Sequence, residues 1–164
     1  QQAQQAQNNR PSSSGSNSNS GSNSNSGSTS SNNSGSSSSN TNYGSGDTSA
    51  AQAIVSAAWS YVGVPYVYGG TSRSGIDCSG LTMRCHEAAG ISIPRTSGAQ
   101  AGSGKSVGSL SEALPGDIIC YPGHVAIYLG NSRVIHAPQP GDVVKEASVY
   151  MGSSQPITAI RRYW

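Results

Sequence analysis

The sequence predicts one α+β domain, residues 49–164, preceded by a disordered linker, residues 1–48. Composition supports the division, because the first 49 residues hold 19 Ser, 10 Asn and 6 Gly and no Val, Ile, Leu, Met, Trp or Cys. Such a segment cannot bury enough apolar surface to offset its conformational entropy. The fold class follows from the order of patterns in the remainder, where helical periodicity comes first and strand-like runs follow Pro115. Helices followed by an antiparallel meander are typical of an α+β domain.

The first predicted helix begins at Ser49. Ser49 and Gln52 have the spacing of a capping box. Apolar residues then recur at helical spacing. Gly63 and Pro65 follow this run and predict its end.

Residues 64–76 are rich in glycine and are expected to form a loop. A second helix is expected over Asp77–Ala89 and is stopped by Gly90. A short helical turn is expected over Thr96–Ala101.

The second half of the domain is predicted to consist of β-strands. Gly130-Asn131 lies between two strand-like runs and predicts a hairpin turn. The expected strands are Ile118–Tyr121, His124–Leu129, Arg133–Ala137, Val143–Val149 and Ile157–Tyr163.

Charge and hydropathy exclude several classes of function. The net charge is only +2 and the basic residues are scattered, so we expect no nucleic-acid partner. No run of 18 or more apolar residues is present, so we expect no membrane segment in this chain. The chain begins with Gln1 and no signal peptide is visible, so we interpret it as a fragment or a processed product.

Three residues have the chemistry of a thiol-dependent site. Cys78 opens a predicted helix, where unpaired amides and the helix dipole favour a thiolate. His124 opens a strand and His136 closes the next one. Because Gly130 is the midpoint between the two histidines, we expect them to lie opposite each other within about one residue of register. His136 would then orient His124 as the third member of a catalytic triad.

Six sequence blocks closely resemble the NlpC-type family of papain-like cell-wall peptidases, in order and in spacing. The resemblance covers essentially all of residues 50–164. The blocks are Pro65–Gly70, Gly75–Leu81, Gly90-Ile91 with Pro94–Ser97, Pro115–Ile118, Gly123–Gly130 and Ile135–Ala137.

The resemblance implies a papain-like α+β fold, with N-terminal helices packed on a small antiparallel sheet. It implies a cysteine endopeptidase that hydrolyses peptidoglycan stem peptides at the bond from γ-D-glutamate, or D-isoglutamine, to the diamino acid. Cys78 matches the nucleophile, His124 the general base and His136 the third member. No metal or cofactor is implied, and we expect a monomer that is secreted or associated with a bacterial cell wall. The oxyanion and substrate-binding positions of the family correspond to Tyr66, Asp77, Ser79, Arg95 and Ser97.

Several of these residues also admit structural interpretations. Asp77 is a candidate helix N-cap and Arg95 a candidate ion-pair partner. We expect Tyr68 to form an aromatic wall, His86 to lie on the surface, and Cys85 and Cys120 to be buried free thiols. A Cys85–Cys120 disulfide is the alternative for an extracellular domain.

Other classes of function stay open from the sequence alone. Cys78, His124 and His136 have side chains that suit zinc, but the short ligand spacing usual in structural zinc sites is missing. A non-catalytic wall-binding module and an amidase or transferase acting on another amide are the remaining alternatives, because papain-like folds support several chemistries.

Overall fold

The computed structural model describes residues 48–164, so all of the expected linker except Thr48 lies outside the described residues. No helix in the described range is both long and apolar enough to cross a membrane. The helices are α1 (Thr48–Tyr61), α2 (Cys78–Ala88) and α3 (Ser97–Ala101), with a 3₁₀ turn at Leu110–Glu112. The strands are β1 (Thr71–Ser72), β2 (Gly75–Ile76), β3 (Lys105–Ser106), β4 (Ile118–Tyr121), β5 (His124–Gly130), β6 (Arg133–His136), β7 (Lys145–Ser148) and β8 (Ala159–Arg162).

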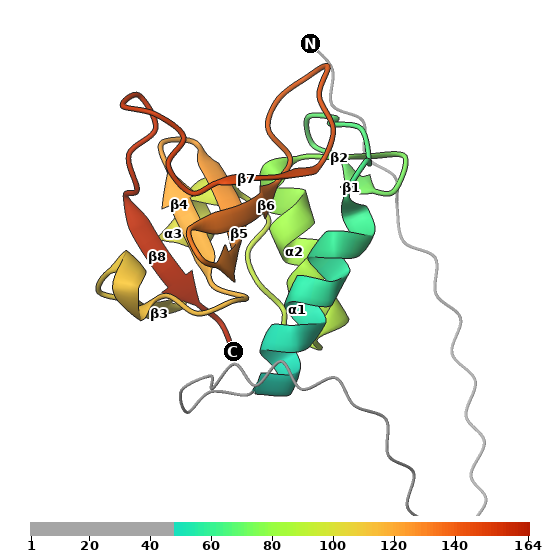
Figure 1. Cartoon of the computed structure of the whole chain (residues 1–164). Coiled ribbons are helices and arrows are strands. Elements are labelled where there is room, and N and C mark those ends of the chain that lie inside the picture. The colour runs from blue at the N-terminus through green and yellow to red at the C-terminus, as the bar shows by residue number, and fades with distance from the viewer. Residues whose placement is uncertain (1–47) are drawn as a thin grey trace, which may run out of the picture. The chain divides into compact units, whose positions relative to one another are not determined.

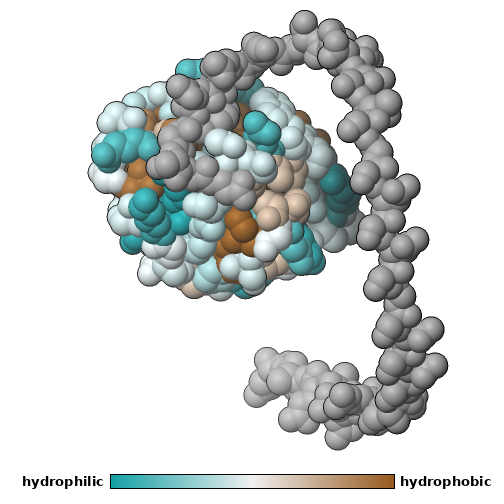
Figure 2. All heavy atoms as spheres, turned by 90° about the horizontal axis from the view of Figure 1, so that it is seen from below, coloured by the Kyte–Doolittle hydropathy of each residue, from teal (hydrophilic) through white to brown (hydrophobic). Residues whose placement is uncertain are grey.

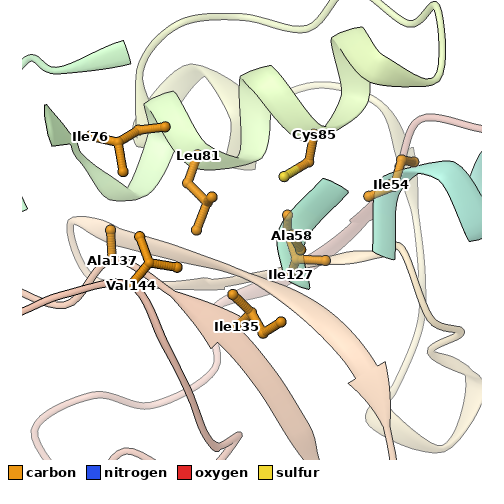
Figure 3. Close-up of a cluster of buried hydrophobic side chains, with 9 residues drawn as sticks. All are labelled: Ile54, Ala58, Ile76, Leu81, Cys85, Ile127, Ile135, Ala137 and Val144. Atoms are coloured by element: carbon orange, nitrogen blue, oxygen red, sulfur yellow. The ribbon is translucent and has the colours of Figure 1, made fainter. Parts of the chain in front are cut away.

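Helices α1 and α2 pack against each other and lie together on one side of the main sheet (Figure 1). Between them and the sheet lies a core of small and branched apolar side chains (Figure 3). Burying such side chains is the main favourable term in folding, about 1.5–3 kcal/mol for each large aliphatic residue. This core fixes α2 over strands β5 and β6. Its buried members are Ile54, Ala58, Ile76, Leu81, Cys85, Ile127, Ile135, Ala137 and Val144.

The main sheet is antiparallel and has the strand order β3-β8-β4-β5-β6-β7. Strands β4 to β7 follow one another as the expected meander. The last strand, β8, returns to pair with β4 on the opposite side from β5, and β3 pairs with the outer edge of β8. The result is an open six-stranded sheet with β3 and β7 at its edges. Strand β5, which begins with His124, is internal.

A second apolar cluster covers the other face of the sheet, under the loops that precede β4 and β8. Its buried members include Tyr121, Tyr128 and Ile160. The face of the molecule in Figure 2 has small hydrophobic areas surrounded by hydrophilic and weakly polar side chains. Because both faces of the sheet are covered, the positions of β4, β5 and β6 are fixed by packing from two sides.

The hairpin between β5 and β6 has a two-residue tip. Gly130 pairs with Arg133, and both intervening residues, Asn131 and Ser132, have positive φ, 52° and 57°. This geometry is that of a type I′ turn, in which asparagine is favoured. The backbone amide of Ser132 donates to the Tyr128 hydroxyl at 3.3 Å. The predicted hairpin is confirmed, with its tip one residue further along the chain.

Some element boundaries differ from those expected. The first helix begins at Thr48, so Ser49 lies within its first turn. Strands β7 and β8 are shorter than the expected runs. The two-residue strands β1 and β2 lie in the segment expected to be a loop, and β3 lies where no element was predicted. So short a strand leaves no alternating pattern in the sequence.

The surface position expected for His86 is wrong. His86 is fully buried, and burial lowers its pKa to about 4. Its Nδ1 lies 2.8 Å from the carbonyl oxygen of Thr82, and its ring meets that of Tyr163 edge-on. The partner ring comes from the C-terminal end of the domain, so the local sequence around His86 gives no sign of it.

Cys85 and Cys120 are buried free thiols, as expected. They belong to different apolar clusters, the first with α1 and β6 and the second beneath Cys78. The alternative of a disulfide between them is therefore not supported.

Candidate active site

The N-terminus of α2 presents Cys78 from a rigid platform. Asp77 is the N-cap, as expected, and its Oδ1 accepts a hydrogen bond of 2.7 Å from the backbone amide of Gly80. A Cβ on Gly80 would lie 2.3 Å from the carbonyl oxygen of Gly70, so only glycine lets the loop approach the helix this closely. Cys78 is the first residue of the helix and is 8 % exposed.

Arg95 fixes the same carboxylate from the other side. Its Nη1 and Nη2 donate to the two oxygens of Asp77 at 3.0 and 2.9 Å, and Nη1 also donates to the Ser79 hydroxyl at 2.8 Å. A bidentate pair of this kind fixes orientation as well as charge. Burial by itself raises the pKa of Asp77, but the hydrogen bonds from Arg95, Gly80 and Gly69 outweigh it and keep the pKa below its ordinary value. Asp77 is therefore ionised, and its N-cap and ion-pair roles occur together.

The two histidines form a hydrogen-bonded pair. His124 follows the tight turn Pro122-Gly123 between β4 and β5, and its Nε2 lies 2.9 Å from Nδ1 of His136. The expected contact is confirmed, but the expected register is not. Ile127 pairs with Ile135, which places His136 beside Ala126, two residues from His124. The imidazoles meet diagonally across the strands, a distance that long side chains span.

Cys78 lies where two cavities meet. Cys78, Tyr66 and Gly123 line both of them. The first has a volume of about 390 Å³, and its other lining residues are Tyr68, Gly69, Asp77, Ser79, Arg95, Thr96 and Ser97. The second has a volume of about 330 Å³, and its other lining residues are Pro122, His124, His136, Pro138, Gln139, Met151 and Gln155. A substrate that spans both cavities would pass over the thiol.

The cavities bring together every site residue predicted from the sequence. We call the first the acyl-side cavity, after the role that we propose for it, and the second the histidine-side cavity. Tyr66 lines both, and its pKa is raised by burial and by the nearby Cys78 and Asp77. Tyr68 lines the acyl-side cavity as the expected aromatic wall and is 88 % exposed.

The electrostatics of the thiol differ from the expectation. Burial raises the pKa of Cys78 above its ordinary value, and the charge of Asp77 adds to the rise. The backbone amides of Val125, Ser79 and Cys78 act in the opposite direction but do not compensate. Burial also lowers the pKa of His124 to about 4. Both shifts favour the uncharged forms, a thiol at Cys78 and a neutral imidazole at His124, and the amides at the start of the helix do not outweigh burial at the thiol.

This charge state predicts the pH dependence of thiol alkylation. Iodoacetamide attacks the thiolate, so its rate with Cys78 should stay low at pH 7 and rise tenfold per unit up to the raised thiol pKa. Cys85 and Cys120 are fully buried and should not react while the domain is folded. A rate that is already maximal between pH 5 and 7 would contradict the prediction, because it would indicate a thiolate–imidazolium pair. Mass spectrometry of the alkylated peptide identifies the modified cysteine.

Sequence reasoning missed two further residues that lie beneath the site, Thr82 and Gln100. Both are polar, both are fully buried, and their side chains are joined by a hydrogen bond of 2.6 Å. From sequence, a single polar residue in a short helix is ordinarily predicted to be exposed to solvent. The usable signal is Thr96, an N-cap residue four positions before Gln100, which fixes the start of α3 and hence the face on which Gln100 lies.

A metal site at these residues is not supported. Within residues 48–164, no group of three or more His, Cys, Asp or Glu side chains is arranged to hold a metal ion. The direct contact between His124 and His136 occupies the nitrogens that face each other.

An α+β domain with a cysteine at the start of a helix and a histidine pair on the facing sheet has the architecture of a papain-like cysteine peptidase. The model of the NlpC/P60 family matches residues 63–162. The chain belongs to the NlpC/P60 family, and the resemblance noted from the sequence is confirmed.

The relatives of the chain include probable endopeptidases and dipeptidyl-peptidases. A probable endopeptidase of Mycobacterium tuberculosis is 41 % identical over 114 residues, which are 68 % of this chain and 29 % of that protein. A gamma-D-glutamyl-L-lysine dipeptidyl-peptidase of Bacillus cereus is 36 % identical over 100 residues, 56 % of this chain and 30 % of that protein. The chain thus spans less than a third of either relative.

One solved structure has nearly the same extent as the folded domain. The NlpC/p60 domain of the peptidoglycan hydrolase SagA superposes with a TM-score of 0.60 at 39 % identity. The match covers 68 % of this chain and 97 % of that one. The papain-like fold expected from the sequence is therefore confirmed.

Proposed function

We propose that this domain is a cysteine endopeptidase that hydrolyses peptidoglycan stem peptides at the bond between γ-D-glutamate, or D-isoglutamine, and the diamino acid that follows. The observation that carries the proposal is the position of Cys78 between two cavities, one of which also holds His124 and His136. The names of the relatives support both the substrate and the bond. We expect the domain to act at the cell wall, where that substrate lies.

The hydrogen bond between the histidines leaves one ring nitrogen of His124 free for chemistry. Nε2 of His124 is engaged with His136, so Nδ1 is the nitrogen that accepts the proton from the Cys78 thiol. For this transfer the resting His124 must carry its proton on Nε2 and donate it to Nδ1 of His136. His136 thereby holds both the tautomer and the ring orientation of the base.

In the first half of the reaction, Nδ1 of His124 takes the thiol proton as the sulfur bonds to the scissile carbonyl carbon. The carbonyl oxygen becomes an oxyanion, for which the backbone amide of Cys78 and the Tyr66 hydroxyl are the donors. A preorganised donor of this kind contributes about 3–4 kcal/mol. His124 then gives the proton to the leaving nitrogen, the C–N bond breaks and a thioester remains.

Water completes the cycle. His124 removes a proton from water, the oxygen bonds to the thioester carbon, and the C–S bond breaks as the proton returns to sulfur. Because His124 delivers the proton to the leaving amine, the cavity that it lines takes the diamino acid. The opposite cavity, with Asp77, Ser79 and Arg95, takes the acyl side of the stem.

Digestion of purified peptidoglycan tests this proposal. The wild-type domain should release fragments that end at D-glutamate or D-isoglutamine and fragments that begin with the diamino acid. Lysine-type and diaminopimelate-type walls, digested in parallel and analysed by mass spectrometry, give the preference at the third position. Domain treated with iodoacetamide is the control and should release neither fragment.

Other products would contradict the proposal. Absence of new fragments from both wall types would exclude this substrate. Release of ammonia without chain cleavage would indicate an amidase, and transfer of the acyl group to an added amine in preference to water would indicate a transferase.

A further inference from the structure

Gln100 is the one fully buried side chain of α3, and its polar atoms are all in use. Its amide nitrogen donates to the carbonyl oxygens of Ser79 and Pro94 at 2.9 and 2.8 Å. Its amide oxygen accepts from the Thr82 hydroxyl at 2.6 Å. A buried amide is tolerated only when its groups are paired, and this one is paired on both sides.

The orientation of the amide is fixed by its partners. Two of its three neighbours, at Ser79 and Pro94, are carbonyl oxygens, which only accept hydrogen bonds. The nitrogen must therefore face them and the oxygen must face Thr82. The Thr82 hydroxyl has one proton, and its shortest contact is with Gln100 at 2.6 Å, against 2.9 Å to the Ser79 carbonyl.

These bonds join the two walls of the acyl-side cavity from beneath. Ser79 and Thr82 lie in the first turns of α2, the helix that begins with Cys78. Pro94 directly precedes Arg95, which with Thr96 and Ser97 forms the facing wall. The ion pair between Arg95 and Asp77 joins the same two walls from the solvent side, where the Arg95 side chain is 36 % exposed.

The backbone of Gln100 adds a third anchor. Its carbonyl oxygen accepts from the Tyr163 hydroxyl at 2.8 Å. Tyr163 also packs its ring against His86 on α2. The helix that carries Gln100 is therefore held both to α2 and to the C-terminal segment, so displacement of the amide is opposed from both ends.

We infer that Gln100 is a positioning residue that sets the width of the acyl-side cavity and hence the affinity for the γ-glutamyl side of the substrate. This inference rests on the proposed function. Gln100 touches neither the thiol nor the histidine pair, so the chemistry at Cys78 should not depend on it. Loss of its bonds would leave the Pro94 carbonyl without its buried partner, while the Thr82 hydroxyl would keep its contact with the Ser79 carbonyl. The 94–97 segment would then move away from α2 so that the Pro94 carbonyl reaches water.

Kinetics of Gln100→Met test the inference, because methionine has similar length and no amide. We expect KM for a soluble stem peptide to rise about tenfold or more while kcat stays within about threefold. The alkylation rate of Cys78 should be unchanged. Gln52→Met, on the exposed face of α1, is the matched control and should change neither parameter.

A milder variant covers the case in which Gln100→Met does not fold. Thr82→Val removes one bond to the amide and leaves both nitrogen bonds in place, so KM should rise in the same direction by a smaller factor. An unchanged KM in a folded variant, or a fall in kcat with KM constant, would overturn the inference.

Failure of the proposed function would be seen separately, as absence of cleavage by the wild-type domain. Crystal structures of the wild type and the variant then test the inference without any measurement of enzymatic activity. In Gln100→Met the 94–97 segment should lie further from α2 than in the wild type. An unmoved segment would overturn the positioning role whatever the substrate proves to be.

Discussion

Replacement of Cys78 by alanine is expected to reduce kcat/KM for stem-peptide cleavage by about 10³–10⁶-fold. The variant retains both cavities, the histidine pair and the Asp77–Arg95 pair, but it has no atom that forms a thioester. The backbone amide of Cys78 and the Tyr66 hydroxyl remain, so substrate binding should persist and the loss should fall on kcat. Rates of product formation measured by liquid chromatography, with binding followed by calorimetry, separate the two.

Cys85→Ala is the matched control for this variant. Cys85 lies two turns further along the same helix and is fully buried in the core. Its truncation should lower the free energy of unfolding by about 1 kcal/mol and leave kcat/KM within about twofold. Retained activity in Cys78→Ala, or its loss in Cys85→Ala, would contradict the assignment of the nucleophile.

The helical half of the fold was predictable because its signals are local. Asp77 and Gly90 flank α2 in the sequence, and the N-cap bond from Gly80 involves residues three apart. The hairpin at Asn131 is equally local, since its positive φ requires only the residues of the turn. Such features do not depend on the rest of the chain.

The sheet order was not predictable in the same way. Strand β8 pairs with β4, about 40 residues earlier, and separates β4 from β3. Alternation of apolar residues identifies a strand but not its neighbour. The register of the histidines differs from the prediction because the hairpin tip is Asn131-Ser132 and not Gly130-Asn131. The irregular pairing between Tyr128 and Gly130 takes back one residue of that shift and leaves an offset of two.

Buried polar residues are the part of the site that sequence reasoning misses. The side chain of Gln100 reaches its partners only after α2 and α3 have packed together, and the ring of His86 meets Tyr163 only after the C-terminal segment has packed on α2. Composition and periodicity place such residues on the surface, since an unpaired polar group is costly to bury. The motif residues that line the two cavities were identified, and the buried polar residues packed beneath them were not.

His136 offers the sharpest test of how the base is held. His136→Leu removes the acceptor for Nε2 of His124, so the His124 ring is free to rotate and to carry its proton on the wrong nitrogen. In a triad of known type, loss of the correct tautomer costs about 10⁴-fold in kcat. We expect a loss of about 10²–10⁴-fold here, with KM little changed.

His136→Asn is the conservative variant, because it keeps a hydrogen-bond acceptor for His124 but removes the imidazole ring. The Oδ1 of asparagine lies close to where Nδ1 of the imidazole lies and accepts the same hydrogen bond, so kcat should stay within about tenfold of the wild type. Nitrogen NMR of the His124 ring should show the proton on Nε2 in the wild type and in His136→Asn, and a mixture of tautomers in His136→Leu. Thermal unfolding of each variant verifies that the domain is folded at the assay temperature. Equal losses in the leucine and asparagine variants would mean that His136 acts through its own ring chemistry and not as an acceptor for His124. An unimpaired leucine variant would mean that the cavity walls alone orient the base.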